Sequence, residues 1–499
     1  MLRRGWFTNL AWSGAHQAAT LLSALHPDFE ALITNVPRLL TVDFSSLRQP
    51  RVHFDSQLTI SKSRVSLLAA CAVHYNLDFG LVTRYLGGEY MALHRDPSAI
   101  INRVRGLISD DDLNHIHRVL TIGCPAHFNY EESAANKEAF LRRAYHASLA
   151  SSKEVVDKTL NKEERNSHII PFPWYLVRAS PVAHHVPQVL LQREGKKDCL
   201  VWDGSTKLTP HDVVMNDITP TDFEPEITFG LVYMAFITWI WKLRILFPRE
   251  DIFLAFVDIS SCFRWPRIFP CLVGAFGFII GPLFYVANAM VFGSVSSASS
   301  WEPFRRAIAV LASSYGHSPQ IVRQYQDLLS HTNLALPEVV SDGSPIVTAI
   351  ACSKNQGISH TTPTQHFIYM DDDLMADTQS RIPFALANII HSIYNILGWP
   401  EPTLRPCPLA LDKWLLLRLR TRQVLLGLVF DTRHMTIEID DEYRLQTFTM
   451  LRSTWHKHQE SFTIKEVELL IGKLARIGHA FRPMYHLLPH LYASVAYAL

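Results

Sequence analysis

Carboxylates follow two apolar segments of the chain. LAFVDIS places Asp258 at the end of one apolar run, and FIYMDDD places Asp371 and Asp372 at the end of another. An unpaired buried carboxylate costs several kcal/mol, so acids at such positions need compensation. A divalent ion can neutralise converging carboxylates, and oxygen ligands with little His or Cys nearby favour Mg²⁺ or Mn²⁺ over zinc. We therefore predict a metal site at these three residues, where two ions would suit in-line attack at phosphorus. The alternative is a surface hairpin with solvated acids.

The elements that must position these acids are two strands and the helices beside them. We predict strands at 251–260 and 366–375, because each segment is apolar until its acid appears. A buried helix is predicted before the first strand, at Phe229–Phe247. An amphipathic helix is predicted after the second strand, from 384 to 398, and Gly398 ends it.

Further elements are predicted from turn residues, helical spacing and capping signals. Alternation favours hairpins at 187–203 and 423–440, and a looser β segment at 345–352. Capping boxes are predicted at Ser151 with Glu154 and at Thr463 with Glu466, and the second opens a separate C-terminal helical unit. Helical spacing predicts three more helices, at 63–77, at 304–315 and from Pro319 onward.

Composition limits the class of protein. The chain has 499 residues, 48% of them hydrophobic and 19% charged, so it exceeds one core and is not a disordered chain. Its seven cysteines contain no CxxC pair, which argues against a zinc ribbon and favours an intracellular setting, in cytoplasm or nucleus. With a net charge of +1, binding of nucleic acid would require a local basic patch.

The segment 268–301 contains no Asp, Glu, Lys or Arg and is long enough to span a bilayer. Pro270, Pro282 and several glycines interrupt it, and broken backbone is not tolerated facing lipid. We therefore expect buried core here and no stable membrane association. The N-terminal sequence MLRRGWFTNLAW lacks the clean apolar core of a signal peptide, and a transit peptide is the alternative for it.

Several motifs, in order over about 165–499, resemble those of reverse transcriptases, among them the eukaryotic retroelement enzymes of the DIRS-like and long-terminal-repeat groups. YMDD at 369–372 resembles the metal-binding turn of that family, and VDISSCF at 257–263 its preceding catalytic strand. FGSVSSASSWEPF at 292–304 is similar to the segment that contacts template and nucleotide, and VLLGLVFD at 424–431 to the primer-grip hairpin. CPLALDKW, at 407–414, lies between these last two motifs.

The resemblance implies roles for individual residues. Asp258 and Asp371 would ligate both metal ions, with Asp372 in support, and Lys413 would lie near the leaving pyrophosphate; an isolated lysine is otherwise simply solvated. Phe263 would be an aromatic gate against the ribose 2′-OH, or else core. The remaining implied contacts are to nucleotide by Phe292 and Gly293, and to nucleic acid by Tyr369, Met370, Leu426 and Gly427. Tyr369 alternatively packs, and Gly427 alternatively only permits close backbone approach.

The chain departs from this family at the first hairpin. Cys199 stands four residues before Asp203, where the resemblance implies an arginine that clamps the triphosphate. Lys196, Lys197 or Arg193 would have to substitute as point charges. The stretch between Phe292 and Asp371 is also long, and we assign the excess to an insertion near 305–364. A catalytically decayed or domesticated protein that only binds nucleic acid is therefore the alternative function.

A basic stretch follows the second acid motif. Arg418, Arg420 and Arg422 alternate with other residues and would share one face of a strand, which suits a phosphate backbone or, alternatively, a solvated edge. Lys473, with Arg476 three residues later, would track a duplex or lie on the wet side of the last helix. We interpret Asp373 and Asp377 as solvated acids at a helix start.

These observations lead to one expected architecture. We predict an α+β fold of the right-hand polymerase type, with an antiparallel palm sheet backed by helices. Its expected function is RNA-directed DNA synthesis by a retrotransposon reverse transcriptase that uses Mg²⁺ or Mn²⁺, deoxynucleoside triphosphates and a primed RNA or DNA template. The expected divisions are a helical accessory region at 1–164, fingers at 165–225, a palm at 226–440 with a primer-grip hairpin at 424–439, and a helical thumb at 441–499.

Overall fold

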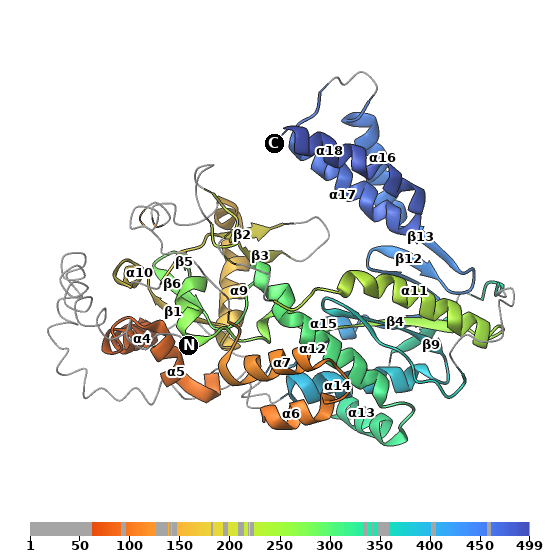
Figure 1. Ribbon diagram of the computed structural model, residues 1–499, viewed down its shortest axis with the longest axis horizontal. Helices are drawn as coiled ribbons and strands as arrows, with labels where there is room; N and C mark the ends of the chain where they lie inside the picture. Colours follow the sequence, from red (N-terminus) through yellow and green to blue (C-terminus); the bar gives the residue numbers. More distant parts are fainter. Residues whose placement is uncertain are drawn as a thin grey trace. The chain divides into compact units, whose positions relative to one another are not determined.

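The described residues of the computed structural model combine helices with four small sheets, which confirms the α+β class (Figure 1). Contacts divide the chain into two interleaved units. Unit 1 comprises Met1–Gly230, Ile259–Ala312 and Ile389–Leu411, and unit 2 the remainder. The structure describes residues 62–90, 96–125, 138, 141, 147–180, 183–192, 198–207, 214–217, 219, 224–332, 337–341, 343–347, 359–400, 406–456 and 461–498.

Unit 2 is built on a five-stranded sheet of order β7-β10-β4-β9-β8. Its centre is β4 (Ile252–Asp258), which pairs antiparallel with β9 (Asp372–Thr378) over seven residues. β8 (Phe367–Tyr369) forms one edge, antiparallel to β9. On the other side β10 (Arg418–Arg420) is antiparallel to β4, and β7 (Glu338–Val340) is parallel to β10.

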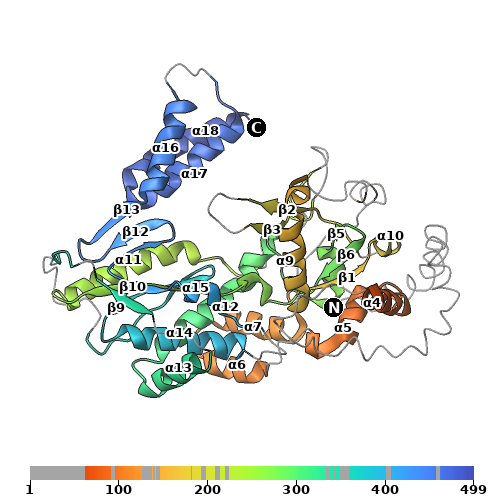
Figure 2. The ribbon, with the colours of Figure 1, turned by 180° about the vertical axis from the view of Figure 1, so that it is seen from behind.

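Helix α11 (Phe229–Leu246) covers one face of this sheet (Figures 1 and 2). The predicted helix is confirmed, but it is buried along one side only, since Leu231 is 72% exposed. Its buried side chains pack against alternate residues of β4 and β9, as the two-residue period of a strand requires. This core contains Phe236, Trp239, Leu243, Leu254, Leu374 and Ala376.

A second sheet of unit 2 consists of β11 (Arg422–Leu425), β12 (Leu428–Asp431) and β13 (Thr436–Ile439). The predicted hairpin at 423–440 is confirmed, but the structure divides this segment into three strands instead of two. Leu426 and Gly427 form the first turn, both with positive φ (50° and 76°). This conformation is strained for Leu426 and natural for glycine.

The C-terminal helical part of unit 2 contains α16 (Asp441–Ser453), α17 (Ile464–Ala480) and α18 (Leu488–Ala498). The capping box at Thr463 and Glu466 is confirmed, since each side chain bonds the other residue's backbone amide. Leu470, Ile471, Leu474 and Leu488 form a separate core between these helices. Unit 2 also contains α13 (Pro319–Thr332), which begins at the predicted proline, and most of α15 (Leu411–Trp414).

Unit 1 contains a sheet of order β1-β6-β5 and a separate hairpin. The sheet comprises β1 (Ile169–Pro173), β6 (Leu283–Ala287) and β5 (Phe278–Ile280). The hairpin of β2 (Gln188–Leu191) and β3 (Cys199–Trp202) is confirmed where it was predicted. The segment 268–301 forms the 3₁₀ helix η4 (Pro270–Phe276), the strands β5 and β6 and the start of a helix. Among the described residues no single helix is long and apolar enough to cross a membrane; one bent pair, Arg64–His74 with Phe79–Leu86, passes by length and composition.

Unit 1 contains the helices α4 (Lys62–His74), α5 (Phe79–Tyr90), α6 (Pro97–Val104), α7 (Asp110–Ile122) and α9 (Lys153–Arg165). Two more helices are shared with unit 2: α12 (Val295–Ser314) ends there, and α14 (Ile382–Leu397) begins there. The predicted helix at 384–398 is confirmed, since Gly398, at φ 97°, follows α14. The predicted helix at 304–315 is longer than expected, because α12 already includes the serine cluster.

One local prediction is wrong, and a second is contradicted in the part that the structure describes. At the start of α9 the cap position is Ser152, whose side chain makes no capping bond, because a 3₁₀ helix (Ala147–Ser152) leads directly into α9. Residues 343–347 form no strand, and 348–352 lie outside the described residues. The β segment that the structure does describe in this region is β7, which gains its hydrogen bonds from β10.

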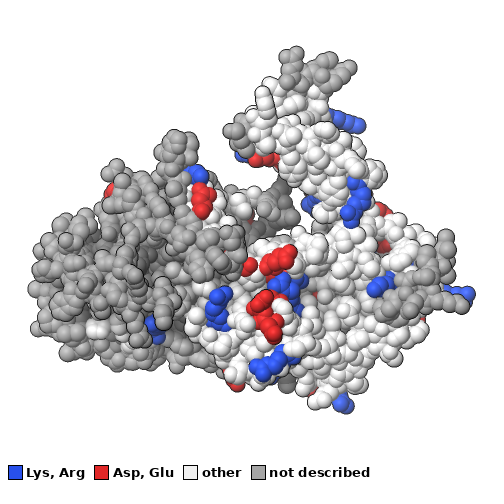
Figure 3. Space-filling view, in the orientation of Figure 1, with Lys and Arg blue, Asp and Glu red and all other residues white. Residues whose placement is uncertain are grey.

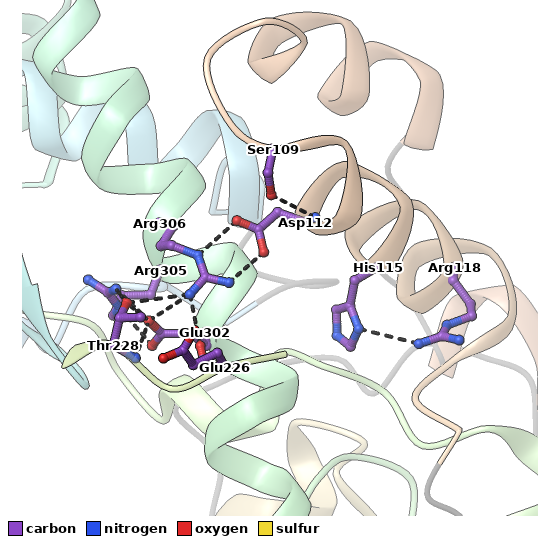
Figure 4. A network of polar contacts seen from close by, with 9 residues as sticks. All are labelled: Ser109, Asp112, His115, Arg118, Glu226, Thr228, Glu302, Arg305 and Arg306. Carbon is purple, nitrogen blue, oxygen red and sulfur yellow. Dashed lines mark hydrogen bonds and ion pairs between the residues drawn. The ribbon is translucent and has the colours of Figure 1, made fainter. Parts of the chain in front are cut away.

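Figure 4 shows how the N-terminal helices join the rest of unit 1. Arg306 of α12 donates to both carboxylate oxygens of Asp112 in α7, at 2.5 and 2.8 Å. It also bonds Glu302, whose side chain is fully buried and is held by Arg305 as well. Helices α7 and α12 are thus connected by a network of charges within one unit.

Candidate active site

The YMDD sequence forms the tip of a hairpin. The predicted single strand at 366–375 is wrong in detail, because a two-residue turn divides it into β8 and β9. Tyr369 pairs with Asp372 across this turn, which consists of Met370 and Asp371. Met370 has a φ of 56°, an unusual conformation for a side chain of this kind. Asp371 therefore lies in the turn, and Asp372 is the first residue of β9.

The register of β4 with β9 brings the third acid to this turn. Asp258, the last residue of β4, lies directly opposite Asp372. Opposite residues of an antiparallel pair lie on the same face with Cβ atoms about 4.5–5.5 Å apart. Asp258 is only 7% exposed. The three predicted acids are therefore brought together at the end of the two central strands.

Crowding and burial disfavour ionisation of this cluster. Burial, with the charges of Asp371 and Asp258, raises the pKa of Asp372 to about 7. Burial and the charge of Asp258 also raise the pKa of Asp371. Oδ1 of Asp372 is buried and has no hydrogen-bond partner among the described residues. The cluster thus holds more negative charge than its surroundings compensate, which is the feature expected of a cation site.

Lys413 of α15 also joins the cluster. Its ammonium group forms an ion pair with Oδ2 of Asp258. Burial lowers its pKa, but the hydrogen bond and charge of Asp258 outweigh this effect and raise the pKa overall. Half of the Lys413 side chain is exposed, so it can leave Asp258 without passing through the core.

One observation favours binding of a divalent ion by this cluster, and another opposes it. Three carboxylates, one with an unpartnered oxygen, are the hard donors that Mg²⁺ and Mn²⁺ prefer. In the described part of the chain, however, no three His, Cys, Asp or Glu side chains are placed so that they could hold a metal ion together. Lys413 instead supplies positive charge at Asp258. The donor chemistry therefore fits, and at Oδ2 of Asp258 a cation would compete with Lys413.

The predicted nucleotide contacts lie in unit 1. Phe263 is buried, at 5% exposure, and packs edge-on against Phe292 with ring centroids 4.9 Å apart, whereas Phe292 is 45% exposed. Gly293 has a φ of 105°, and a Cβ there would lie 1.8 Å from the carbonyl oxygen of Trp202. Gly293 is thus required by close backbone approach. Lys196 and Lys197, like Arg193, lie outside the described residues, and Cys199 is exposed at the start of β3.

The predicted basic face of 418–422 is partly neutralised. Arg418 pairs with Glu338 at 3.0 Å, and Arg422 with Glu438 at 2.8 Å. Arg420 is exposed, and the buried Thr421 separates β10 from β11. On the face drawn in Figure 3, basic and acidic side chains of the described residues lie next to one another.

Lys473 and Arg476 are engaged within unit 2. Both lie over the ring of Tyr443, at 4.6 and 4.1 Å from its centroid. Arg476 also donates to the carbonyl of Gly427 at 2.8 Å, which ties α17 to the first turn of the β11–β13 sheet. Leu426, the other turn residue, packs against the core under α11. Arg476 therefore supports the turn at 426–427, and Lys473 lies beside it over the same ring.

The interpretation of Asp373 and Asp377 as solvated acids is wrong. Both are fully buried in β9, because a strand continues where a helix start was expected. His366 pairs with Asp373 at 2.9 Å, and Arg381 with Asp377 at 2.8 Å. Sequence analysis missed His366 and Arg381. A strict two-residue alternation from Asp372 onward would have placed both acids on the second face of a buried strand.

Comparison with known proteins finds structural likeness only. No family model and no curated protein sequence matches the chain. A foamy viral protease–reverse transcriptase with double-stranded DNA matches with a TM-score of 0.40 and 11% identity, over 79% of this chain and 55% of that one. The complex with an RNA/DNA hybrid gives 0.39 and 12%, over 79% and 42%. Telomerase from Candida albicans, with a fragment of telomeric RNA, gives 0.32 and 10%, over 95% and 88%. The chain thus spans about half the length of the viral proteins, and likenesses this weak decide neither family nor activity.

Proposed function

We propose that this protein catalyses template-directed nucleotidyl transfer as an RNA-directed DNA polymerase. The observation that carries the proposal is the register of β4 with β9, which sets Asp258 opposite Asp372 beside the turn at Asp371. Asp371 and Asp372 both have raised pKa values beside a third, buried carboxylate, and such a grouping is uncommon without a cation to bind. The order of the sequence motifs, including YMDD, supports the polymerase assignment.

Asp258, Asp371 and Asp372 would hold Mg²⁺ or Mn²⁺. When bound, such ions lower the pKa of an attacking hydroxyl and neutralise phosphate charge. The chain's own contribution is mainly placement, because the sheet fixes the three carboxylates before substrate arrives. Lys413, once it has left Asp258, is a mobile ammonium group that can donate a proton to a departing phosphate.

The remaining assignments follow from the resemblance. The β2–β3 hairpin would belong to the fingers, the sheet around β4 and β9 to the palm, the turn at 426–427 to the primer grip, and helices α16–α18 to the thumb. Phe263 and Phe292 would contact the nucleotide, and Arg420 the nucleic-acid backbone. The partners would be deoxynucleoside triphosphates and a primed RNA or DNA template. A retrotransposon origin and action in cytoplasm or nucleus complete the proposal.

Primer extension tests this function. Purified full-length protein is mixed with a primed RNA template, deoxynucleoside triphosphates and Mg²⁺ or Mn²⁺, and extension products are resolved by length. We expect Asp258→Asn and Asp371→Asn to lose activity by about 10² or more, as removal of a charge-stabilising group does. Asp377→Asn is the control for loss of fold, because Asp377 lies on the same strand, β9, but is fully buried and is not one of the three clustered acids. Equal extension by wild type and Asp371→Asn would refute the assigned role.

A second function is favoured by Cys199. Its thiol is exposed at the position where the resemblance implies a triphosphate-binding arginine. A thiol cannot form the bidentate contact of a guanidinium group, so binding of nucleic acid without synthesis is the competing proposal. Appearance of primer extension in Cys199→Arg, with none in the wild type, would support this second function.

A further inference from the structure

The face of β9 that points away from α11 carries two buried carboxylates. Asp373 and Asp377 are fully buried, and both lie opposite apolar residues of β4, namely Val257 and Phe253. Across the hairpin, Asp373 lies opposite Ile368. Neighbouring strands therefore offer these acids no polar side chain. Since buried carboxylates need partners, the partners must come from outside the strand ladder.

The segment that leads into β8 supplies two of these partners. Nδ1 of His366 lies 2.9 Å from Oδ2 of Asp373, and the Phe367 backbone also bonds this carboxylate. Two residues earlier, Thr364 donates to Oδ2 of Asp377. Thr364 thus contacts Asp377, and His366 contacts Asp373. The segment before β8 therefore continues to run antiparallel to β9, beyond the three paired residues of β8.

The hairpin that these contacts adjoin needs support. β8 has only three residues, lies at the edge of the sheet and ends in a turn where Met370 has a positive φ. A backbone conformation of this kind persists only where its surroundings enforce it. A slip of one residue between β8 and β9 would exchange the faces of β8 and move Asp371 out of the turn.

We propose that the His366–Asp373 pair is a positioning element that fixes the register of β8 against β9, and thereby holds Asp371 and Asp372 beside Asp258. The pair spans the hairpin one residue away from Asp372, so a slip would bury both polar groups without their partner. The pair has a free-energy cost, because Nε2 of His366 and Oδ1 of Asp373 are buried without a hydrogen-bond partner in the described structure. An apolar pair would avoid this cost but would not distinguish one register from the next. The consequence for catalysis rests on the proposed function.

Asp377 and Arg381 provide a matched control. They form a buried ion pair on the same face of the same strand, but four residues farther from the turn. Arg381 also donates to the carbonyls of His360 and Thr362. Loss of this pair should lower the stability of unit 2 without loosening the turn at Met370 and Asp371.

The test compares His366→Leu/Asp373→Leu with Arg381→Leu/Asp377→Leu in the full-length chain. Replacement of both partners by apolar residues should lower the midpoint of urea unfolding only slightly. Hydrogen exchange, read by mass spectrometry over 367–374, should be faster by roughly tenfold or more in the first variant and unchanged in the second. Wild-type exchange in the first variant, at a midpoint near that of wild type, overturns the proposal.

A conservative comparison applies if the leucine pair does not fold. Asp373→Asn keeps an acceptor for Nδ1 of His366, whereas Asp373→Ala removes it. We expect Asn to retain slow exchange at 367–374 and Ala to lose it, and equal rates in the two variants would contradict the proposal.

Primer extension then measures the consequence for the site. In the first leucine pair kcat should fall roughly tenfold or more, with the KM for nucleotide within about twofold of wild type, because placement rather than binding is lost. A purely structural role predicts that kcat follows the unfolding midpoint in both variants. The exchange measurement does not need catalysis, so an inactive wild type counts against the proposed function while exchange still decides the register proposal.

Discussion

Asp372→Asn should stabilise the metal-free protein at pH 8 while it abolishes activity. Burial and the charges of Asp371 and Asp258 raise the pKa of Asp372 to about 7, whereas an unfolded aspartate has a pKa of about 3.9. Between these values the folded state binds a proton that the unfolded state has released. Stability therefore falls as the pH rises from about 4 to about 7, and the full cost is present above pH 7.

The size of this cost follows from the difference in pKa. Roughly three units at 1.36 kcal/mol each give about 4 kcal/mol as an upper bound. Asp372 is partly exposed and shares its proton affinity with two neighbours, so solvent and coupling reduce the effect. We expect Asp372→Asn to gain about 2 kcal/mol in the free energy of unfolding at pH 8. The gain should shrink as the pH falls toward about 4 and should vanish only below about pH 3, where both states are protonated.

Urea unfolding in metal-free buffer at pH 4.5 and pH 8 measures the difference, with tryptophan fluorescence as the signal. Asp377→Asn is the control on the same strand, because this carboxylate is fully buried in β9 and is paired with Arg381 at 2.8 Å. Its substitution should destabilise at both pH values. Mg²⁺ should stabilise wild type at pH 8 by mass action, and Asp372→Asn much less. A loss of stability in Asp372→Asn at pH 8 would show that the acids are compensated, and the reasoning would fail.

Three further changes test other parts of the structure. Arg306→Ala, which removes both bonds to the carboxylate of Asp112, should lower the free energy of unfolding by about 2–3 kcal/mol, and a double-mutant cycle with Asp112→Ala should show coupling in urea unfolding. Gly293→Ala should destabilise by several kcal/mol, seen as a fall in the thermal midpoint, since its Cβ would lie 1.8 Å from a backbone oxygen. Arg476→Ala should leave the carbonyl of Gly427 without its donor and raise hydrogen exchange at 424–429.

Sequence reasoning recovered elements whose signals are local. The helix at 229–246, the hairpin of β2 and β3 and the capping box at Thr463 were predicted because apolar spacing, turn residues and capping residues lie within a few positions of one another. The three acids were found because polar residues interrupt strongly apolar runs. The sequence favours a meeting of Asp258 with Asp372 but does not determine it, since strand register depends on contacts distant in sequence.

What sequence reasoning missed depends on partners from elsewhere in the chain. Asp373 and Asp377 look solvated beside two other aspartates, and only the pairing of β9 with β4 shows that they are buried. Lys473 and Arg476 resemble a basic helix face, yet the ring of Tyr443 lies beneath both. Arg422 likewise finds Glu438 across a sheet. Whether a charged side chain faces solvent or pairs with another residue can therefore be decided only from the tertiary structure.

Asp372 and Asp373, consecutive at the start of β9, therefore have different surroundings because their side chains lie on opposite faces of the strand. Asp372 shares its face with Asp258 and has a buried oxygen without a partner, and its pKa is raised to about 7. Asp373 has the opposite orientation and its own histidine at 2.9 Å. Compensation, and not residue type, separates an acid that is available for a cation from one that is committed to structure. The uncompensated carboxylates of Asp371 and Asp372 are costly to fold, and the proposed cation site would offset that cost.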